Sequence, residues 1–424
     1  MSMVELHHTV DTVGKIGRLQ TLCCMPVYAG DSLEVNFGAE LEFSAMRRRI
    51  LSDAELTIAA FYTPYRHFWG DTWVDFIKGG LKETQTLTNI TGLTAVPNYL
   101  AWNGINGSVF RPALAGYNRI WNRYWRLPMH ESEITDTAIE SDEEGLNYGR
   151  HVARIPTIVT GAADVDFVNA DTQVSATSSL DIIQLEQVKA RYSSEIQREW
   201  FNHEYYTDIM EGIWGKGVNI DADQRPELLW THRQWIGGHN KEGLDDAALG
   251  NKKGAQFADI NVMIPRKRVI EHGIVHVMAT VRMPFRHYDE RHYFQRVQNP
   301  SYKEIGADLK VLSAEGPIDE NPQDFFVSSD GTTVIGQQPY GQWMRFHPNY
   351  IHPAYEEAEG YPFLKDTNIV NNTNDHRFTC NSAEYDEMFT SLQYGHFTIN
   401  GAFQIEGMRA VPDSLTSIYA GARR

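Results

Sequence analysis

The chain has few cysteines and no long apolar run. Its 424 residues include three cysteines, Cys23, Cys24 and Cys380, and the adjacent Cys23 and Cys24 are poorly placed to bridge each other. This set is too small for a disulfide framework and suits folding in a reducing cytoplasm. The first residues contain no apolar core of a secretory signal, and no stretch reaches the length that spans a bilayer. We therefore expect a protein that is made in the cytoplasm and does not enter a membrane.

Positive charge is also scarce. The chain has 38 lysines and arginines against 55 aspartates and glutamates, which gives a formal net charge of −17 at pH 7. Because an acidic surface repels polyanions, this composition excludes a protein that binds nucleic acid over its whole surface. Any contact with DNA or RNA must be confined to one local basic face.

The sequence signatures of common catalytic sites are missing. There is no GxxxxGK[ST] phosphate loop, no GxSxG nucleophile elbow, no CxxC pair and no HExxH zinc motif. No histidine has another histidine two positions away, which argues against the metal-binding strand of a cupin enzyme. We therefore expect no catalytic residues, no cofactor and no enzymatic activity.

Two patterns resemble metal sites only superficially. His272 and His276 are four residues apart, but they fall in a strand-like run where that spacing covers about 13 Å, too far to share one metal. Asp221-Ala222-Asp223 resembles the start of a calcium loop, but Pro226 and His232 stand where glycine and glutamate are required. A turn is predicted there, with incidental binding of a divalent ion left open, and no metal site is expected.

Several early segments carry the pattern of β-strands. Leu19–Val27 is a β-prone run, and Leu33–Phe37 alternates apolar and polar residues as a half-buried strand does. Gly38-Ala39 interrupts this alternation and predicts a bulge. Another strand is expected at Glu55–Tyr62. Strands that follow one another through short turns indicate an antiparallel sheet.

The middle of the chain loses this pattern. Helices are expected at Tyr117–Arg126 and, in two successive pieces, over residues 178–212, whereas residues 217–261 indicate a mixed polar loop. Strand character returns in Val269–Met283, Gln342–Phe346 and Phe397–Ile405. This order is typical of an all-β barrel with large surface insertions. We expect a single domain with strands mainly in residues 15–80 and 260–410 and a large insertion at about 80–260.

One predicted helix concentrates basic and aromatic side chains. Arg119, Arg123 and Arg126 fall on one face of it, and Trp121 and Trp125 occupy part of the remainder. Arginines beside aromatic rings bind single-stranded nucleic acid without reading sequence, through the backbone charge and base stacking. We therefore take these five residues as candidates for contact with a nucleic acid. The alternative is an amphipathic helix whose rings lie in the core and whose arginines pair with acidic neighbours.

Other charged runs are less distinctive. Arg47, Arg48 and Arg49 form a second candidate cluster for nucleic-acid contact, with the same ambiguity. The segment Glu131–Glu144 carries seven carboxylates and few apolar anchors, and it predicts a solvated loop.

Short segments spread along most of the chain share the order of a known family. They are Gly14–Leu19, Pro26–Ser32, Met46–Arg49, Phe61–His67, Trp73–Gly80, Gly116–Asn122, Ser179–Ile182, Asp221–Pro226, Glu271–Gly273, Gly341–Trp343, Pro353–Tyr355 and Glu359–Phe363. In sequence and in order they resemble the major capsid proteins (protein F) of the Microviridae, small single-stranded DNA bacteriophages. Each segment is short, but their collinearity argues against chance.

The resemblance implies an eight-stranded antiparallel jelly-roll barrel with long loop and helix insertions. It also implies that copies of the chain build a T=1 icosahedral shell around a circular single-stranded DNA genome, in a virion assembled in the bacterial host cytoplasm. The implied partners are further copies of the chain, single-stranded DNA on the inner face, and spike, scaffolding and small basic DNA-packaging proteins. The alternative from another class is a carbohydrate-binding or hydrolytic jelly-roll protein that acts on the host surface.

Overall fold

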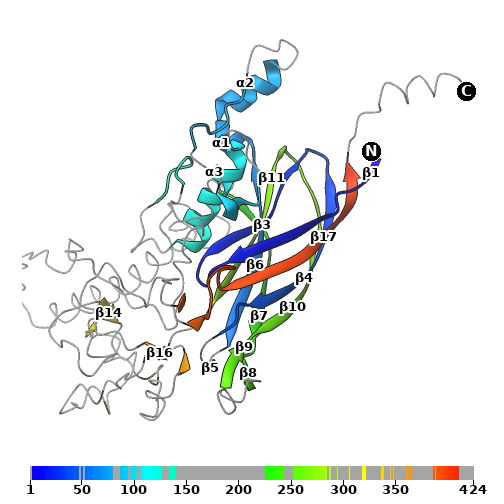
Figure 1. Cartoon of the computed structure of the whole chain (residues 1–424). Coiled ribbons are helices and arrows are strands. Elements are labelled where there is room, and N and C mark those ends of the chain that lie inside the picture. Colours follow the sequence, from blue (N-terminus) through cyan, green and yellow to red (C-terminus); the bar gives the residue numbers. More distant parts are fainter. Residues whose placement is uncertain are drawn as a thin grey trace, which may run out of the picture.

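The structure of the chain is a computed structural model, shown in Figure 1. It describes residues 2–46, 49–50, 53–79, 86–93, 97–102, 107–126, 133–139, 225–242, 252–283, 286–287, 294, 305, 318–320, 336–338, 344, 347, 360–361, 363–364, 385–386 and 388–409. Most of these residues belong to two large antiparallel sheets and to the helices beside them.

The first sheet has five strands, and the long C-terminal strand organises it. Its strands are β1 (Ser2–Glu5), β2 (His8–Gly14), β4 (Ser32–Phe43), β10 (Phe257–Arg268) and β17 (Phe397–Arg409). Along one edge β17 pairs with β4, and along the other it pairs with both β1 and β2. Beyond β4, β10 forms the opposite border of the sheet.

The second sheet has four strands in the order β3-β11-β6-β7. They are β3 (Leu19–Val27), β6 (Ala54–Pro64), β7 (Glu227–Ile236) and β11 (Gly273–Arg282), and all neighbours are antiparallel. Along the chain, successive strands alternate between the two sheets, first from β2 through β3 and β4 to β6, and again from β7 through β10 and β11 to β17. The alternation is interrupted once, because β6 and β7 are neighbours in the same sheet.

Eight short strands form four further two-stranded pairs. They are β5 (Arg49–Ile50) with β15 (Gly360–Tyr361), β8 (His239–Glu242) with β9 (Lys252–Ala255), β12 (Arg286–His287) with β16 (Phe363–Leu364), and β13 (Ile318–Glu320) with β14 (Gly336–Gln338).

The largest apolar cluster fills the space between the two sheets. Along β4, inward side chains such as Leu33 and Phe37 alternate with outward polar ones, as expected of a strand with one wet face. Phe37 stacks on Phe403 of β17, with ring centroids 4.3 Å apart. Burial of one such side chain contributes roughly 1.5–3 kcal/mol to stability. The core therefore holds the two sheets face to face.

Helices cover the outer face of the four-stranded sheet. A second apolar cluster joins Leu114 and Tyr117 of α3 (Arg111–Ile120) to Phe61 of β6 and Met278 of β11. One π-helical turn, η2 (Trp121–Trp125), continues α3, and the short 3₁₀ turn η1 (Asn98–Leu100) packs in the same cluster. The remaining helices, α1 (Arg66–Trp69) and α2 (Asp71–Gly79), follow β6, and α2 projects away from the sheets (Figure 1).

The helix and the sheet meet most closely at His276. Its ring is fully buried, and its Nε2 atom lies 3.1 Å from the carbonyl oxygen of Ala113, to which it donates a hydrogen bond. On the helix side stands Gly116, where a Cβ atom would lie 2.4 Å from Cε1 of His276. A glycine at this position lets α3 lie directly against β11.

Several strands and the basic helix agree with the sequence prediction. Strands are confirmed at Leu19–Val27, at Glu55–Tyr62 within β6 and at Phe397–Ile405 within β17. The helix expected from Tyr117 is also confirmed, and it begins earlier, at Arg111, with a proline in its first turn. The predicted antiparallel, mostly β architecture is confirmed as well.

Two local predictions are wrong. The pairing of β4 with β17 runs without interruption through Gly38 and Ala39, so there is no bulge between these two strands. A Cβ atom on Gly401, which faces Ala39, would lie 2.4 Å from the Cβ of Ala39; the small residues keep the strands close and do not break them. The polar loop expected over 217–261 contains the edge strand β7, whose alternation is weak because much of it faces solvent. It also contains the start of the edge strand β10, in which exposed and buried residues alternate from Phe257 onward.

Some expected elements cannot be compared. The helices predicted over 178–212, the turn at Asp221–Asp223 and nearly all of Gln342–Phe346 lie outside the described residues. The division of the chain into a single domain stays a prediction.

The burial of His276 predicts a dependence of stability on pH. Desolvation lowers the pKa of His276 from 6.5 to about 4, so the folded chain keeps this ring neutral while the unfolded chain takes up a proton below about pH 6.5. The contribution of this ring to stability is fully present above pH 6.5 and is lost as the pH falls to about 4, roughly 3 kcal/mol in all.

The measurement is the free energy of unfolding by urea between pH 4 and pH 7.5, for the wild-type chain and for His276→Gln, which keeps a donor for Ala113. The wild-type chain should lose more stability than the variant across this range. Equal slopes for the two proteins would contradict the assignment.

Candidate genome-facing helix and barrel-end network

The basic helix is held against the sheet by its aromatic side chains. Trp121 and Trp125 are each only 4% exposed, and the ring of Trp125 meets Phe61 of β6 edge to face at 5.1 Å. The π-helical turn closes with a hydrogen bond of 2.8 Å from the backbone N–H of Arg126 to the carbonyl of Trp121. Because both indole rings are covered, they are not available to stack on bases in this conformation.

Arg119 and Arg126 pair with acidic neighbours. Arg119 binds Asp136 through two hydrogen bonds, of 2.8 Å from Nε and 2.5 Å from Nη2. The side chain of Arg126 is only 2% exposed, and its Nη2 lies 3.4 Å from Glu133. Arg123 is half-buried on the same helix. For Arg119 and Arg126 the geometry agrees with the alternative interpretation, in which the rings are core and the arginines form ion pairs.

The acidic partners come from a segment that is fastened to the helix. Asn118 donates hydrogen bonds to the carbonyl oxygens of Thr135 and Ala138, and Asn122 exchanges two hydrogen bonds with the backbone of Ile134. The described part of the acidic segment, residues 133–139, is a partly exposed loop, as predicted, and these hydrogen bonds fasten it to the helix. The signal overlooked in the sequence is the pair of asparagines one helical turn apart.

The other candidate sites are less fully described. Arg47 and Arg48 lie outside the described residues, and Arg49 begins β5, whose backbone pairs in parallel with β15. His276 is buried under α3, whereas His272 lies in the turn before β11, where its Nδ1 is 3.3 Å from the backbone nitrogen of Ala29. Among the residues that the structure describes, no group of three potential ligands is placed to hold a metal ion.

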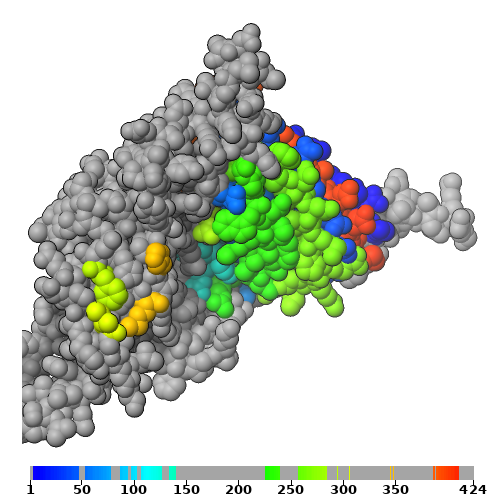
Figure 2. All heavy atoms as spheres, turned by 90° about the horizontal axis from the view of Figure 1, so that it is seen from below, coloured from blue at the N-terminus to red at the C-terminus, as the bar shows by residue number. Residues whose placement is uncertain are grey.

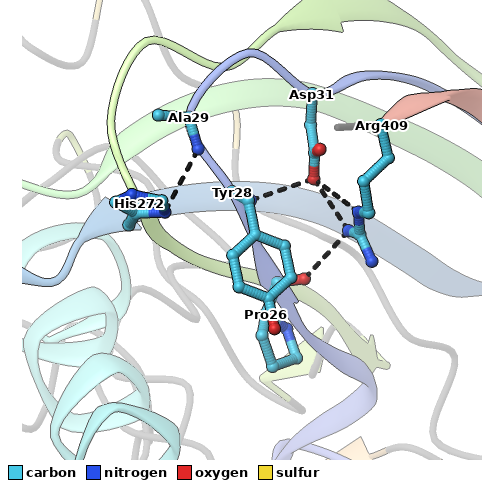
Figure 3. Close-up of polar contacts among 6 residues, drawn as sticks. All are labelled: Pro26, Tyr28, Ala29, Asp31, His272 and Arg409. Atoms are coloured by element: carbon cyan, nitrogen blue, oxygen red, sulfur yellow. Dashed lines mark hydrogen bonds and ion pairs between the residues drawn. The ribbon is translucent and has the colours of Figure 1, made fainter. Parts of the chain in front are cut away.

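A polar network that the sequence analysis missed ties together one end of the barrel (Figure 3). Asp31, in the turn between β3 and β4, is fully buried and accepts hydrogen bonds on one oxygen from the backbone of Tyr28 (2.9 Å) and from Arg409 (2.7 and 3.0 Å). Arg409 is the last residue of β17, lies over the ring of Tyr28 at 4.8 Å and also donates to the carbonyl of Pro26 at 3.3 Å. Since these residues are far apart in the sequence, no local pattern could indicate the pair.

The edge strands of the two sheets meet on another side of the protein. β7 and β10 contact each other, and Gln234 donates a hydrogen bond of 3.1 Å to the carbonyl of Asp259. Residues of these strands form one continuous face in Figure 2, in green. This face exposes large apolar side chains, including Trp235, Phe257 and Met263, each at least 60% exposed. Exposed apolar side chains gathered on one face mark a surface suited to contact with another protein.

Comparison with known proteins decides the family. The profile of the family described as capsid protein (F protein) matches residues 1–163 and 152–419, nearly the whole chain. The chain belongs to this F capsid protein family. Its relatives include capsid protein F of Escherichia phage G4, which is 30% identical over 98% of this chain and 96% of its own length.

Two further relatives agree with this assignment. Capsid protein F of Enterobacteria phage phiK is 27% identical, and that of Escherichia phage alpha3 is 26% identical, each over 98% of this chain and 97% of the relative. The expected resemblance to the capsid proteins of the Microviridae is thus confirmed. Membership in the F capsid protein family implies a structural role, self-association and a place in the virion. In the described part of the chain, no helix is long and apolar enough to cross a bilayer.

The barrel-end network predicts a large cost for removing Arg409. Arg409→Gln leaves the Asp31 carboxylate buried with the Tyr28 N–H as its main donor, which should lower the free energy of unfolding by about 3 kcal/mol. The matched control is Arg266→Gln, because Arg266 pairs with Glu34 at 3.4 Å while both side chains remain well exposed. That change should cost less than about 1 kcal/mol. Equal losses in urea unfolding would show that the Asp31–Arg409 pair has no special weight.

Proposed function

We propose that this chain is the major capsid subunit of a small bacteriophage and closes into a T=1 icosahedral shell around a circular single-stranded DNA genome. The observation that carries the proposal is the match to the F capsid protein family along nearly the whole chain. It favours a capsid role over the alternative of a carbohydrate-binding or hydrolytic protein at the host surface. The genome, the shell geometry and assembly in the bacterial host cytoplasm belong to this proposal.

The strand order supports an eight-stranded jelly roll. If β1 is set aside as an extension that pairs with β17, each sheet keeps four strands, in the orders β2-β17-β4-β10 and β3-β11-β6-β7. Along the chain the eight strands are β2, β3, β4, β6, β7, β10, β11 and β17. The first, β2, and the third, β4, both pair with the last, β17, and the second, β3, pairs with the seventh, β11. These are the neighbours that two Greek keys produce when they wrap around one core.

The charges support a genome contact on the helix side of the barrel. The uncovered face of the five-stranded sheet exposes Glu40, Glu42 and Asp259, which would repel a polyanion. On the opposite side, α3 and η2 carry the partly exposed Arg119 and Arg123. We propose these two as the genome-facing arginines of the helix, with Arg47–Arg49 as the second cluster. Small basic DNA-packaging proteins, with spike and scaffolding proteins, are the further partners proposed.

Purification of the assembled material from infected cells tests the proposed function. Electron microscopy should show closed icosahedral particles made mainly of this chain. Nucleic acid released from them should be cut by a single-strand-specific DNA endonuclease and resist exonucleases, because it is circular. A monomer or small oligomer that binds or degrades a sugar polymer would overturn the proposal.

If Arg119 and Arg123 contact the genome, replacing them should weaken the dependence of DNA retention on salt concentration. In Arg119→Gln/Arg123→Gln particles, DNA retention should fall less steeply with salt, by roughly 0.7 in the log–log slope for each lost phosphate contact. The matched control is Asp136→Asn, which breaks the ion pair of Arg119 and keeps its charge. If the arginines act only through that ion pair, Asp136→Asn should reproduce the defect. If they bind DNA, the control should keep the wild-type slope.

A further inference from the structure

The helix α2 presents apolar side chains to solvent. Val74 and Ile77 lie three residues apart on it and are 42% and 53% exposed. The first turn is anchored, because Trp73 packs against Tyr65 at 5.3 Å and against Trp69 at 6.0 Å. α2 projects from the barrel beyond α1 (Figure 1). The helix is thus fixed at its base while its apolar ridge remains uncovered by the described residues that anchor it.

A pocket of about 680 Å³ opens between the two sheets at the end of the barrel where α1 begins. Its walls are mainly apolar and include Leu33, Val35, Ile264 and Val275, which face inward from both sheets. The strand pairing is irregular in both sheets beside it: the register shifts between Ala60 and Phe61 of β6, and between Ile264 and Lys267 of β10. Extra residues at these points disturb the pairing next to the edges β7 and β10, where the core stays open.

The rim of the pocket and the exposed part of α2 carry opposite charges. Four basic side chains line the pocket against two carboxylates, Glu227 and Glu271. The basic ones are Arg66, Arg225, Lys267 and Arg268. Each carboxylate is paired with one basic residue, Glu271 with Arg66 at 2.8 Å and Glu227 with Lys267. The exposed Arg268 adds positive charge to this rim, while α2 exposes Asp71 and Asp75.

We propose that α2 of one copy inserts Val74 and Ile77 into the pocket of a second copy, with Asp71 and Asp75 facing its basic rim. This contact rests on the proposed capsid function, which requires copies of the chain to associate. A ridge and a matching pocket on the same chain provide both halves of the contact, so that every copy in a closed assembly engages its neighbours in the same way. The apolar insertion supplies the affinity, and the charges orient the helix.

The first test compares two changes on the same helix. Ile77→Asp places a carboxylate in the apolar ridge, whereas Thr72→Asp adds the same charge at an exposed position beside Asp71 and removes no apolar surface. In cells infected with phage that encodes each variant, Ile77→Asp should lower the yield of sedimenting particles at least tenfold. Thr72→Asp should assemble like the wild type. Thermal unfolding of the unassembled chains, followed by circular dichroism, verifies that both variants fold.

The second test exchanges the charges across the contact. Asp75→Arg and Arg268→Glu should each reduce assembly, and the two changes in one chain should restore it, because the reversed pair attracts again. Normal assembly of Ile77→Asp, or failure of the double variant to exceed both single variants, would overturn the contact and leave the capsid function intact. A wild-type chain that forms no particles would overturn both. Insertion of α2 would also be refuted if every variant assembled fully while a small apolar ligand occupied the pocket.

Discussion

Phe37 and Phe403 stack in the middle of the five-stranded sheet, and around them the inner faces of both sheets exclude water. Because side chains alternate along a strand, this inner set also fixes which residues of β4, β6, β10 and β11 point outward. On the four-stranded sheet the outward set is apolar and receives α3, with Gly116 lying directly over His276. On the five-stranded sheet the outward set includes the acidic Glu40, Glu42 and Asp259 beside apolar residues such as Met263, and it remains exposed. One core therefore produces a pair of packed sheets whose two outer faces differ chemically.

The sequence was most informative where β-prone residues form a long run. β3 and β6 are buried along almost their whole length, β17 lies inside its sheet, and their residue patterns predicted them. β7 and β10 border the sheets, so that polar residues occupy many of their positions and the segment resembled a loop. Gly38-Ala39 suggested a bulge, but the small side chain of Ala39 is needed because Gly401 of the neighbouring strand approaches it closely. A single strand cannot show a constraint that its neighbour imposes.

In the candidate site, too, the sequence could not show which residues contact each other, here the partners of the charged side chains. Arg119 and Arg123 lie on the helix that the sequence predicted, whereas Arg126 follows its last turn in an extended conformation and is buried. Their partners could not be assigned locally: Asp136 and Glu133 reach them through a loop that Asn118 positions. The barrel-end pair of Asp31 and Arg409 connects residues nearly the whole chain apart. The family resemblance, in contrast, rests on the order of short segments, and it stands without any knowledge of contacts.

The net charge of −17 sets a condition on any assembly of this chain. Identical acidic copies repel one another, but at physiological salt this repulsion is screened within about 8 Å. A contact between copies must therefore bury apolar surface or place opposite charges directly against each other, where screening has little effect. The described surface concentrates both features at few places, among them the β7–β10 face and the end of the barrel with its basic rim. The acidic residues elsewhere on the surface repel each other and so disfavour every approach between copies that does not bring such places together.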